Sequence, residues 1–292
     1  MKCEDNKSTK KPRIWELDFL RGIAILMVTW DHLMFNIFGL FGGLWETVPT
    51  LAPWVTFAED YHFGILRLIF WPVFVVIFFF VSGICTQLSK NNWVRGLKLT
   101  IVAMGVSIVT YFVGPEAFIF MGVLHSLALS ILLFALVATF TSLIKGPYAK
   151  HIKCLIYFVI GCILIIINQK YNYGMYQLSA GTEAYPEIYW TKEAFAGQGI
   201  FVYRHEFWVS NDYFALLPYF IYFMFGASAS AIFYEEKKSL LPKLDGQWNT
   251  AITFVGKNSL AVYLAGMVLC IAFLMLVTLF VTGDAGLSAL GM

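Results

Sequence analysis

The chain has 292 residues, of which 59% are hydrophobic and only 13% are charged, and its mean hydropathy is +0.72. Too few polar residues are present to cover a soluble globule, so the composition excludes a soluble domain and indicates an integral membrane protein. The formal net charge of +2 gives no reason to expect a nucleic-acid partner.

The apolar runs are long and continuous and lack the period-2 alternation of a barrel strand, so they predict transmembrane helices. The expected fold is an all-α, polytopic membrane bundle. Its seven candidate spans are residues 22–45, 63–88, 97–113, 117–144, 154–168, 213–234 and 251–282. The fifth run is the shortest. The seventh is long enough to contain an interfacial turn near Lys257 before its span.

Basic residues occur in the N-terminal tail and in the loops around residues 90–98, 145–153 and 237–243, all on one side if seven spans alternate. The positive-inside rule then predicts a cytoplasmic N-terminus in a multi-pass protein of the cell membrane. With no internal repeat or low-complexity linker, residues 1–292 form one expected domain. Within it, residues 1–16 are a cytoplasmic tail and residues 169–212 a long extracytoplasmic loop.

The loop at residues 169–212 is rich in aromatic residues. Aromatic side chains at this position are most often an interfacial belt. The alternative is a lid or platform for an external acceptor, because long ordered loops tend to carry function.

The first apolar run contains a pattern of ionisable residues. Arg21 and His32 are eleven residues apart, which at about 100° and 1.5 Å per residue places them on one helical face, about 16 Å apart along the axis. Asp18 lies one turn before Arg21, where it can pair with the guanidinium. Asp31 lies one step around the helix from His32, so the two side chains are not expected to hydrogen-bond.

Ionisable side chains inside a membrane are costly and therefore indicate a functional site. Other interpretations stay open. His32 could be a neutral interhelical hydrogen-bonding group, and Asp31 could be a structural partner or line a water-filled cavity. His125 in the fourth run could share a polar cavity with His32 or only bond a neighbouring helix. Arg67 is expected to extend toward the membrane surface.

Two further segments carry polar residues at the ends of apolar runs. In SNDYFALLPYF, from Ser210, Asp212 lies where it can cap the following helix. In GKNSLAVYL, from Gly256, a predicted helix start with Lys257, Asn258 and Ser259 favours anions such as phosphate. The five cysteines show no metal-ligand spacing, so no metal is expected.

Several segments resemble, in order, the membrane domain of heparan-alpha-glucosaminide N-acetyltransferase and its bacterial relatives. They are Asp18, LRGIAILMVTWDH, FFFVSGI, MGVLHSLALS, SNDYFALLPYF and GKNSLAVYL. The spacing of Arg21 and His32 is also similar to that in the wider transmembrane acyltransferase superfamily. The resemblance extends from about residue 13 to residue 268.

The resemblance implies transfer of an acyl group, usually acetyl, from cytosolic acyl-CoA to a sugar amine or hydroxyl outside. His32 corresponds to the catalytic histidine, and Arg21 to an arginine associated with the donor. Asp31 or His125 would orient His32 or polarise the thioester carbonyl, and Lys257, Asn258 and Ser259 would join Arg21 at the donor phosphates. A covalent acyl-histidine is a second route.

The remaining expectations concern support and partners. Asp18, Asp212 and Tyr213 would hold the substrate or the structure around the site. The partners would be membrane lipid, an extracytoplasmic glycan or glycolipid acceptor, and a second copy of the chain in a homodimer. Two other classes of function stay open: a proton-coupled transporter, which also uses intramembrane carboxylates and histidines, and a non-catalytic membrane protein whose polar residues join helices.

Overall fold

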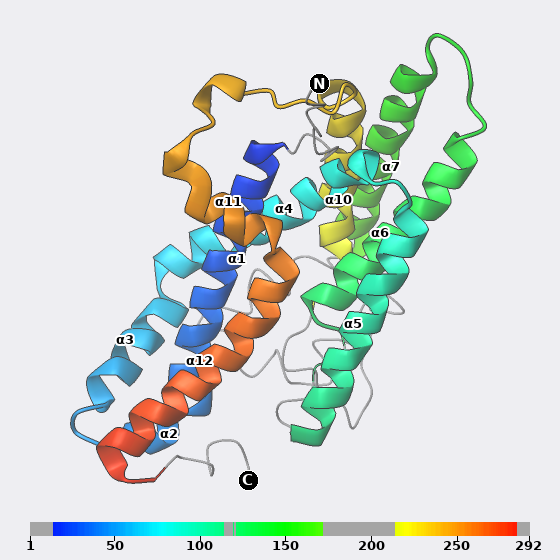
Figure 1. The fold of residues 1–292 in the computed structure, drawn as a ribbon. Coiled ribbons are helices and arrows are strands. Elements are labelled where there is room, and N and C mark those ends of the chain that lie inside the picture. The colour runs from blue at the N-terminus through cyan, green and yellow to red at the C-terminus, as the bar shows by residue number, and fades with distance from the viewer. Residues whose placement is uncertain (1–13, 114–118, 120, 172–213, 285–292) are drawn as a thin grey trace, which may run out of the picture.

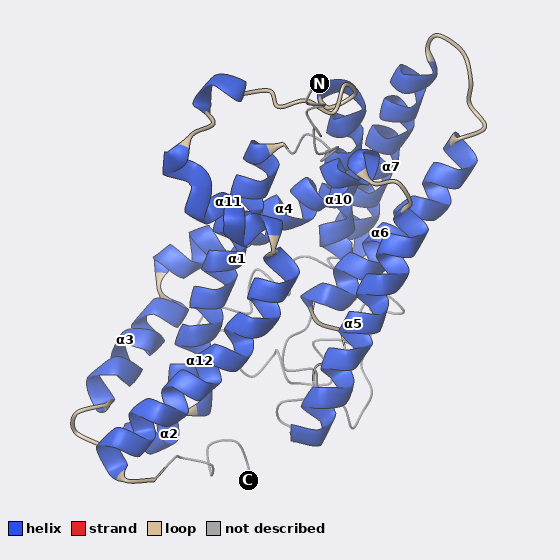
Figure 2. Cartoon of the chain, viewed as in Figure 1, coloured by secondary structure: helices blue, strands red, loops and turns tan. Residues whose placement is uncertain are grey.

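The computed structural model describes residues 14–113, 119, 121–171 and 214–284. The described part of the chain is helical, and none of it forms a strand (Figure 2). The helices are α1 (Trp15–Phe35), α2 (Gly42–Trp45), α3 (Ala52–Phe63), α4 (Ile65–Leu88), α5 (Asn92–Val113), α6 (Val123–Thr141), α7 (Ala149–Tyr171), α10 (Leu216–Phe233), α11 (Thr250–Lys257) and α12 (Ser259–Thr282). A π-helix (Asn36–Leu40) extends α1, and two 3-10 turns (Pro242–Leu244 and Gln247–Asn249) precede α11.

Seven of the helices are long and apolar enough to cross a membrane, so the predicted number of spans is confirmed. The first helix begins at Trp15, earlier than the apolar run suggests, because its first turns are buried by other parts of the protein. The helix break predicted near Lys257 is present, since α11 ends there and α12 begins two residues later. Most of the predicted tail and of the long loop lies outside the described residues.

The helices form two groups (Figure 1). In one group, α3, α4, α11 and α12 pack against α1. In the other, α10 packs against α6 and α7, and α5 lies along α6. Helix α4 joins the groups because it contacts both α1 and α10. The main apolar core lies along this junction, where Phe79 of α4 stacks on Tyr219 of α10 at 5.0 Å between ring centroids.

Glycines allow α4 and α10 to approach closely. A Cβ atom at Gly83 would overlap the backbone of Phe223, and one at Gly226 would overlap the backbone of Phe80. Helix association inside a membrane depends on van der Waals packing, which small residues at the interface make possible. The two glycines therefore fix the distance between the two groups of helices.

The start of α1 is held by a buried carboxylate that no sequence pattern singles out. Glu16 accepts hydrogen bonds from the backbone N–H of Leu240 at 2.7 Å, the Ser239 hydroxyl at 2.8 Å and the Tyr234 hydroxyl at 3.5 Å. Burial and the Glu16 carboxylate raise the pKa of Tyr234 to about 12, so this hydroxyl remains a donor at neutral pH. These bonds attach the segment that follows α10 to α1.

Candidate functional site

Polar side chains gather around Arg21, near the start of α1. Its Nη1 lies 3.5 Å from the Asp18 carboxylate, as the spacing of these residues predicts, and 3.5 Å from the Gly256 carbonyl oxygen. Its Nη2 donates to the sulfur of Cys85, near the end of α4, at 2.8 Å. Three helices thus direct polar groups at one guanidinium, whose Nε is buried and has no hydrogen-bond partner among the described residues.

Close backbone packing creates this arrangement. A Cβ atom at Gly256 would overlap the Asp18 carbonyl, and one at Gly22 would overlap the carbonyl of Ile252. Both glycines lie where α1 crosses α11, so that crossing requires residues without side chains. The crossing brings the Gly256 segment against Arg21, although more than 230 residues of chain separate them.

The residues after Gly256 occupy the junction of α11 and α12. Lys257 ends α11 with an exposed side chain, and Asn258 donates from Nδ2 to the Phe254 carbonyl at 2.9 Å. Ser259 begins α12, so the predicted helix start is present. The structure therefore brings Gly256 to Arg21, while Lys257 remains exposed beside this contact.

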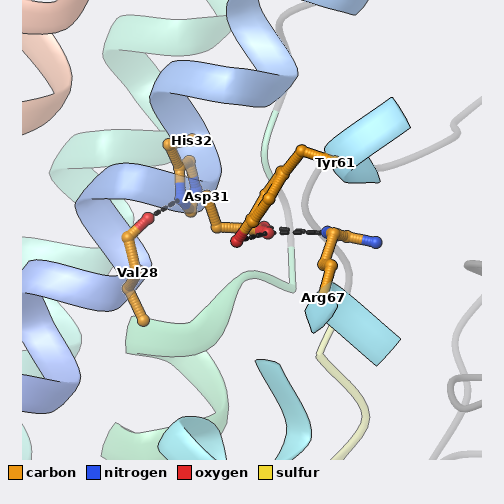
Figure 3. A network of polar contacts seen from close by, with 5 residues as sticks. All are labelled: Val28, Asp31, His32, Tyr61 and Arg67. Carbon is orange, nitrogen blue, oxygen red and sulfur yellow. Dashed lines mark hydrogen bonds and ion pairs between the residues drawn. The ribbon is translucent and has the colours of Figure 1, made fainter. Parts of the chain in front are cut away.

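The ring of His32 is held in one orientation. Its Nδ1 lies 2.9 Å from the carbonyl oxygen of Val28, one turn earlier on α1 (Figure 3). A carbonyl only accepts, so Nδ1 must be the protonated nitrogen, and in the neutral ring Nε2 then carries a lone pair. Nε2 has no hydrogen-bond partner among the described residues, and the ring meets Tyr263 of α12 edge-on at 6.2 Å.

Arg21 and His32 share one face of α1, as their spacing predicts. Arg21 contacts α11 through Gly256, and His32 contacts the following helix, α12, through Tyr263. One side of α1 therefore presents a cation near its start and, about 16 Å farther along the axis, an imidazole whose Nε2 has no partner among the described residues.

Asp31 points away from His32 (Figure 3). Its Oδ1 accepts from Nε of Arg67 at 2.6 Å and its Oδ2 from Nη2 at 3.2 Å, which makes a bidentate ion pair between α1 and α4. The Tyr61 hydroxyl lies 3.4 Å from the same carboxylate. The expectation that Arg67 extends to the membrane surface is wrong, because its side chain is only 16% exposed and turns inward to Asp31.

Two residues of α3 lie beside the Asp31–Arg67 ion pair. Burial raises the pKa of Tyr61 to about 12, as does the Asp31 carboxylate, so the hydroxyl stays protonated and able to donate. Burial lowers the pKa of His62 to about 4, as does the Arg67 guanidinium, so His62 is neutral at physiological pH. The His62 ring stacks on Phe38 at 5.3 Å. Sequence reasoning missed both residues, because neither belongs to an apolar run with a recognisable motif.

His125 lies on a different pair of helices. The Ser107 hydroxyl donates to the Ile119 carbonyl at 2.7 Å, so Nε2–H of His125 donates to the Ser107 oxygen, 3.0 Å away, and joins α6 to α5. None of the contacts of His32 involves His125. Among the described residues no hydrogen bond or ring contact joins the two histidines, and His125 pairs with a neighbouring helix.

The remaining predictions concern Asp212, Tyr213 and metal ligands. Asp212 and Tyr213 lie outside the described residues. No group of three or more histidine, cysteine, aspartate or glutamate side chains that could hold a metal occurs within residues 14–113, 119, 121–171 and 214–284. The chemistry available at α1 is therefore that of a cation, an oriented imidazole and an ion-paired carboxylate.

Comparison with protein families gives one informative match. The model of the catalytic region of heparan-alpha-glucosaminide N-acetyltransferase matches residues 13–268, which include α1 with its polar residues, α4, α6, α10 and the first part of α12. Searches of curated proteins and of solved structures give no match. Because the family match covers most of the chain and includes both Arg21 and His32, the protein belongs to the heparan-alpha-glucosaminide N-acetyltransferase catalytic family and is a multi-pass membrane protein of the acetyltransferase type.

Proposed function

We propose that the protein transfers an acyl group, most simply acetyl, from cytosolic acyl-CoA to an amine or hydroxyl of an extracytoplasmic sugar or glycoconjugate. The observation that carries this proposal is the oriented imidazole of His32, with Nδ1 donating to Val28 and Nε2 without a partner in the described part of the chain, on the same helix face as Arg21. The family to which the chain belongs supports the acetyl group.

The donor binds at the start of α1. Arg21 meets a phosphate of acyl-CoA, and the exposed Lys257 with Asn258 and Ser259 borders the same region from the α11–α12 junction. The thioester end of the donor extends along α1 toward His32, a distance of about 16 Å that the long pantetheine arm can span. Asp18 holds the Arg21 guanidinium in direction through their ion pair.

His32 acts as the general base in direct transfer. Nε2 accepts a proton from the acceptor amine or hydroxyl while that nitrogen or oxygen attacks the thioester carbonyl. The carbon–sulfur bond breaks, CoA leaves as a thiolate, and the imidazolium returns the proton to it. The Val28 carbonyl stabilises the imidazolium because it accepts from Nδ1 throughout.

Asp31 and His125 have different parts in this proposal. The Asp31 carboxylate holds α4 and α3 against α1 through Arg67 and Tyr61, so it positions the helix turn that carries His32. His125 fixes α6 to α5 through Ser107. Asp212 and Tyr213 precede α10 and would border the acceptor side.

The test is acetyl-CoA binding and turnover by purified protein in detergent. Replacing a positioned general base typically costs about 10²- to 10⁴-fold in rate, so His32→Ala should lose transfer by that factor while retaining donor binding. Arg21→Ala should weaken donor binding. His151→Ala, which removes an exposed histidine near the start of α7, is the matched control and should behave like the wild type.

Two results would contradict the proposal. Folded wild-type protein that binds no acyl-CoA at any workable concentration would exclude the acyltransferase function and favour proton-coupled transport, tested next by solute uptake under a pH gradient. If His32→Ala lowers the melting temperature but leaves transfer unchanged, His32 only joins helices and does not act in catalysis.

A further inference from the structure

A second, partly buried arginine lies near the polar groups that surround Arg21. Arg95, one turn into α5, is within electrostatic range of both Cys85 and Arg21. The start of α5 is fixed over the end of α4, because Nδ2 of Asn92 donates to the Thr86 carbonyl at 3.0 Å. The Arg21 guanidinium of α1 therefore contacts the thiol at the end of α4, and the Arg95 guanidinium of α5 lies within electrostatic range of the same thiol.

Neither arginine is fully paired within the described residues. Nε of Arg21 and Nη1 of Arg95 are buried and have no acceptor. Asp18, at 3.5 Å, is the carboxylate that pairs with Arg21, whereas Arg95 has no ion pair and no side-chain hydrogen bond to any described residue. Among the described residues, therefore, a carboxylate pairs with Arg21 and none pairs with Arg95.

Such an arrangement is unfavourable without an anion. Burying a charge without a partner costs several kcal/mol, and two like charges near one another add to that cost. Guanidinium groups bind phosphate with two parallel N–H···O bonds, and their rigid fork matches phosphate oxygens better than a lysine ammonium does. The unpaired N–H groups of Arg21 and Arg95 provide donors of this kind from two separate helices.

We propose that Arg95 and Arg21 together form a site for a phosphate ester beside Cys85, with Arg95 as its second cation. This inference rests on the proposed function, because the phosphate ester would be a phosphate group of the acyl-CoA donor. An anionic lipid headgroup offers the same chemistry, so the experiment includes both sources.

The first arm compares ligands with and without phosphate. Affinities for CoA and for pantetheine, which lacks the phosphates, are measured by calorimetry on the full chain in detergent. Loss of one hydrogen bond to a charged group corresponds to roughly a 10- to 100-fold change in affinity, so Arg95→Gln should reduce the preference for CoA over pantetheine by that factor. The control is Lys98→Gln, which removes an exposed cation three residues after Arg95 on α5 and should keep the preference for CoA.

The second arm uses thermal stability. The melting temperatures of wild type and Arg95→Gln are measured in detergent with and without pyrophosphate. They are also measured in nanodiscs that contain phosphatidylglycerol in place of phosphatidylcholine. Without any ligand, Arg95→Gln should melt no lower than the wild type, because it removes an unpaired buried charge. If Arg95→Gln does not fold, Arg95→Lys, which keeps the charge and lacks the fork, should show an intermediate loss of CoA preference.

The outcomes separate this site from the proposed function. CoA binding that does not depend on Arg95, with no Arg95-dependent effect of lipid or pyrophosphate, would overturn the phosphate site and leave the acyltransferase function standing. Absence of acyl-CoA binding, with stabilisation by phosphatidylglycerol that requires Arg95, would keep the phosphate site as a lipid site and remove the proposed function. No Arg95-dependent effect of any phosphate ligand, together with no acyl-CoA binding, would overturn both.

Discussion

The ion pair of Asp31 and Arg67 joins α1 to α4 inside the bundle. Their closest atoms are 2.6 Å apart, and the side chains are 9% and 16% exposed. A buried ion pair of this kind contributes little net stability, but the loss of one partner leaves an uncompensated charge. Asp31 therefore depends on Arg67, and the geometry of α1 beside His32 depends on both.

Arg67→Gln is expected to lower the free energy of unfolding by about 3–5 kcal/mol, because it leaves the Asp31 carboxylate buried and unpaired. The measurement is thermal unfolding in detergent. Adding Asp31→Asn to Arg67→Gln should recover part of the loss, since no charge then remains.

The matched control is an exposed ion pair of equal length. Lys150 and Glu235 are also 2.6 Å apart, but their side chains are 46% and 52% exposed. Lys150→Gln should change stability by less than about 1 kcal/mol. If Arg67→Gln has the same melting temperature as Lys150→Gln, the ion pair of Asp31 and Arg67 has no positioning role.

Among the helices, the crossing of α4 and α10 determines how the bundle is assembled. Gly83 and Gly226 bring the two backbones into contact, and the stacked rings of Phe79 and Tyr219 fill the adjacent space. Helix α4 also contacts α1 and carries Arg67 and Cys85. The crossing of α4 and α10 therefore determines where Arg67 reaches Asp31 and where Cys85 reaches Arg21 on α1.

Gly226→Ala should destabilise the protein, because the new methyl group meets the Phe80 carbonyl, a backbone atom that cannot move unless the helices separate. Overpacking typically costs about 1–3 kcal/mol, measured here as a fall in melting temperature.

Gly105→Ala is the control at a partly exposed position of α5. No atom lies within 4 Å of the position that the new methyl group would occupy, and alanine is the better helix former by roughly 0.5–1 kcal/mol. This variant should melt at the same temperature as the wild type or higher. Equal melting of Gly226→Ala and Gly105→Ala would contradict the close crossing.

On the scale of the whole molecule, seven helices of the described residues are long and apolar enough to cross a membrane, and if all seven cross it, the start of α1 and the end of α12 lie on opposite sides. The proposed function requires the Arg21 cluster at the start of α1 to face the cytoplasm, where acyl-CoA is found. The basic loops predict the same orientation.

Labelling with a membrane-impermeant maleimide tests this orientation in intact cells. Lys145→Cys, in the loop between α6 and α7, should react only after the cells are permeabilised. Thr50→Cys, between α2 and α3, should react without permeabilisation. Both positions are exposed, and wild-type protein gives the background of the native cysteines. The reverse pattern would place Arg21 outside the cell and exclude a cytosolic donor at that site.

The sequence predicted a large part of the fold and a smaller part of the site. Seven spans and the break before α12 follow from runs of apolar residues, and the shared face of Arg21 and His32 follows from helix periodicity. The partner of Asp31 and the approach of Arg95 to Arg21 could not be predicted in this way. A buried carboxylate signals that a cation must lie near it, but nothing in the pattern along one helix identifies which arginine on another helix supplies it.

The sequence by itself determined the membrane class, the spans and the residues on each face of α1, because hydropathy and helical period are local properties of the chain. Only the tertiary structure decided that Asp31 pairs with Arg67, that His125 bonds Ser107, and that Arg95 approaches Arg21 beside Cys85. These contacts join helices far apart in the sequence. Their rotation and separation are set by close backbone crossings at glycines such as Gly83, Gly226 and Gly256.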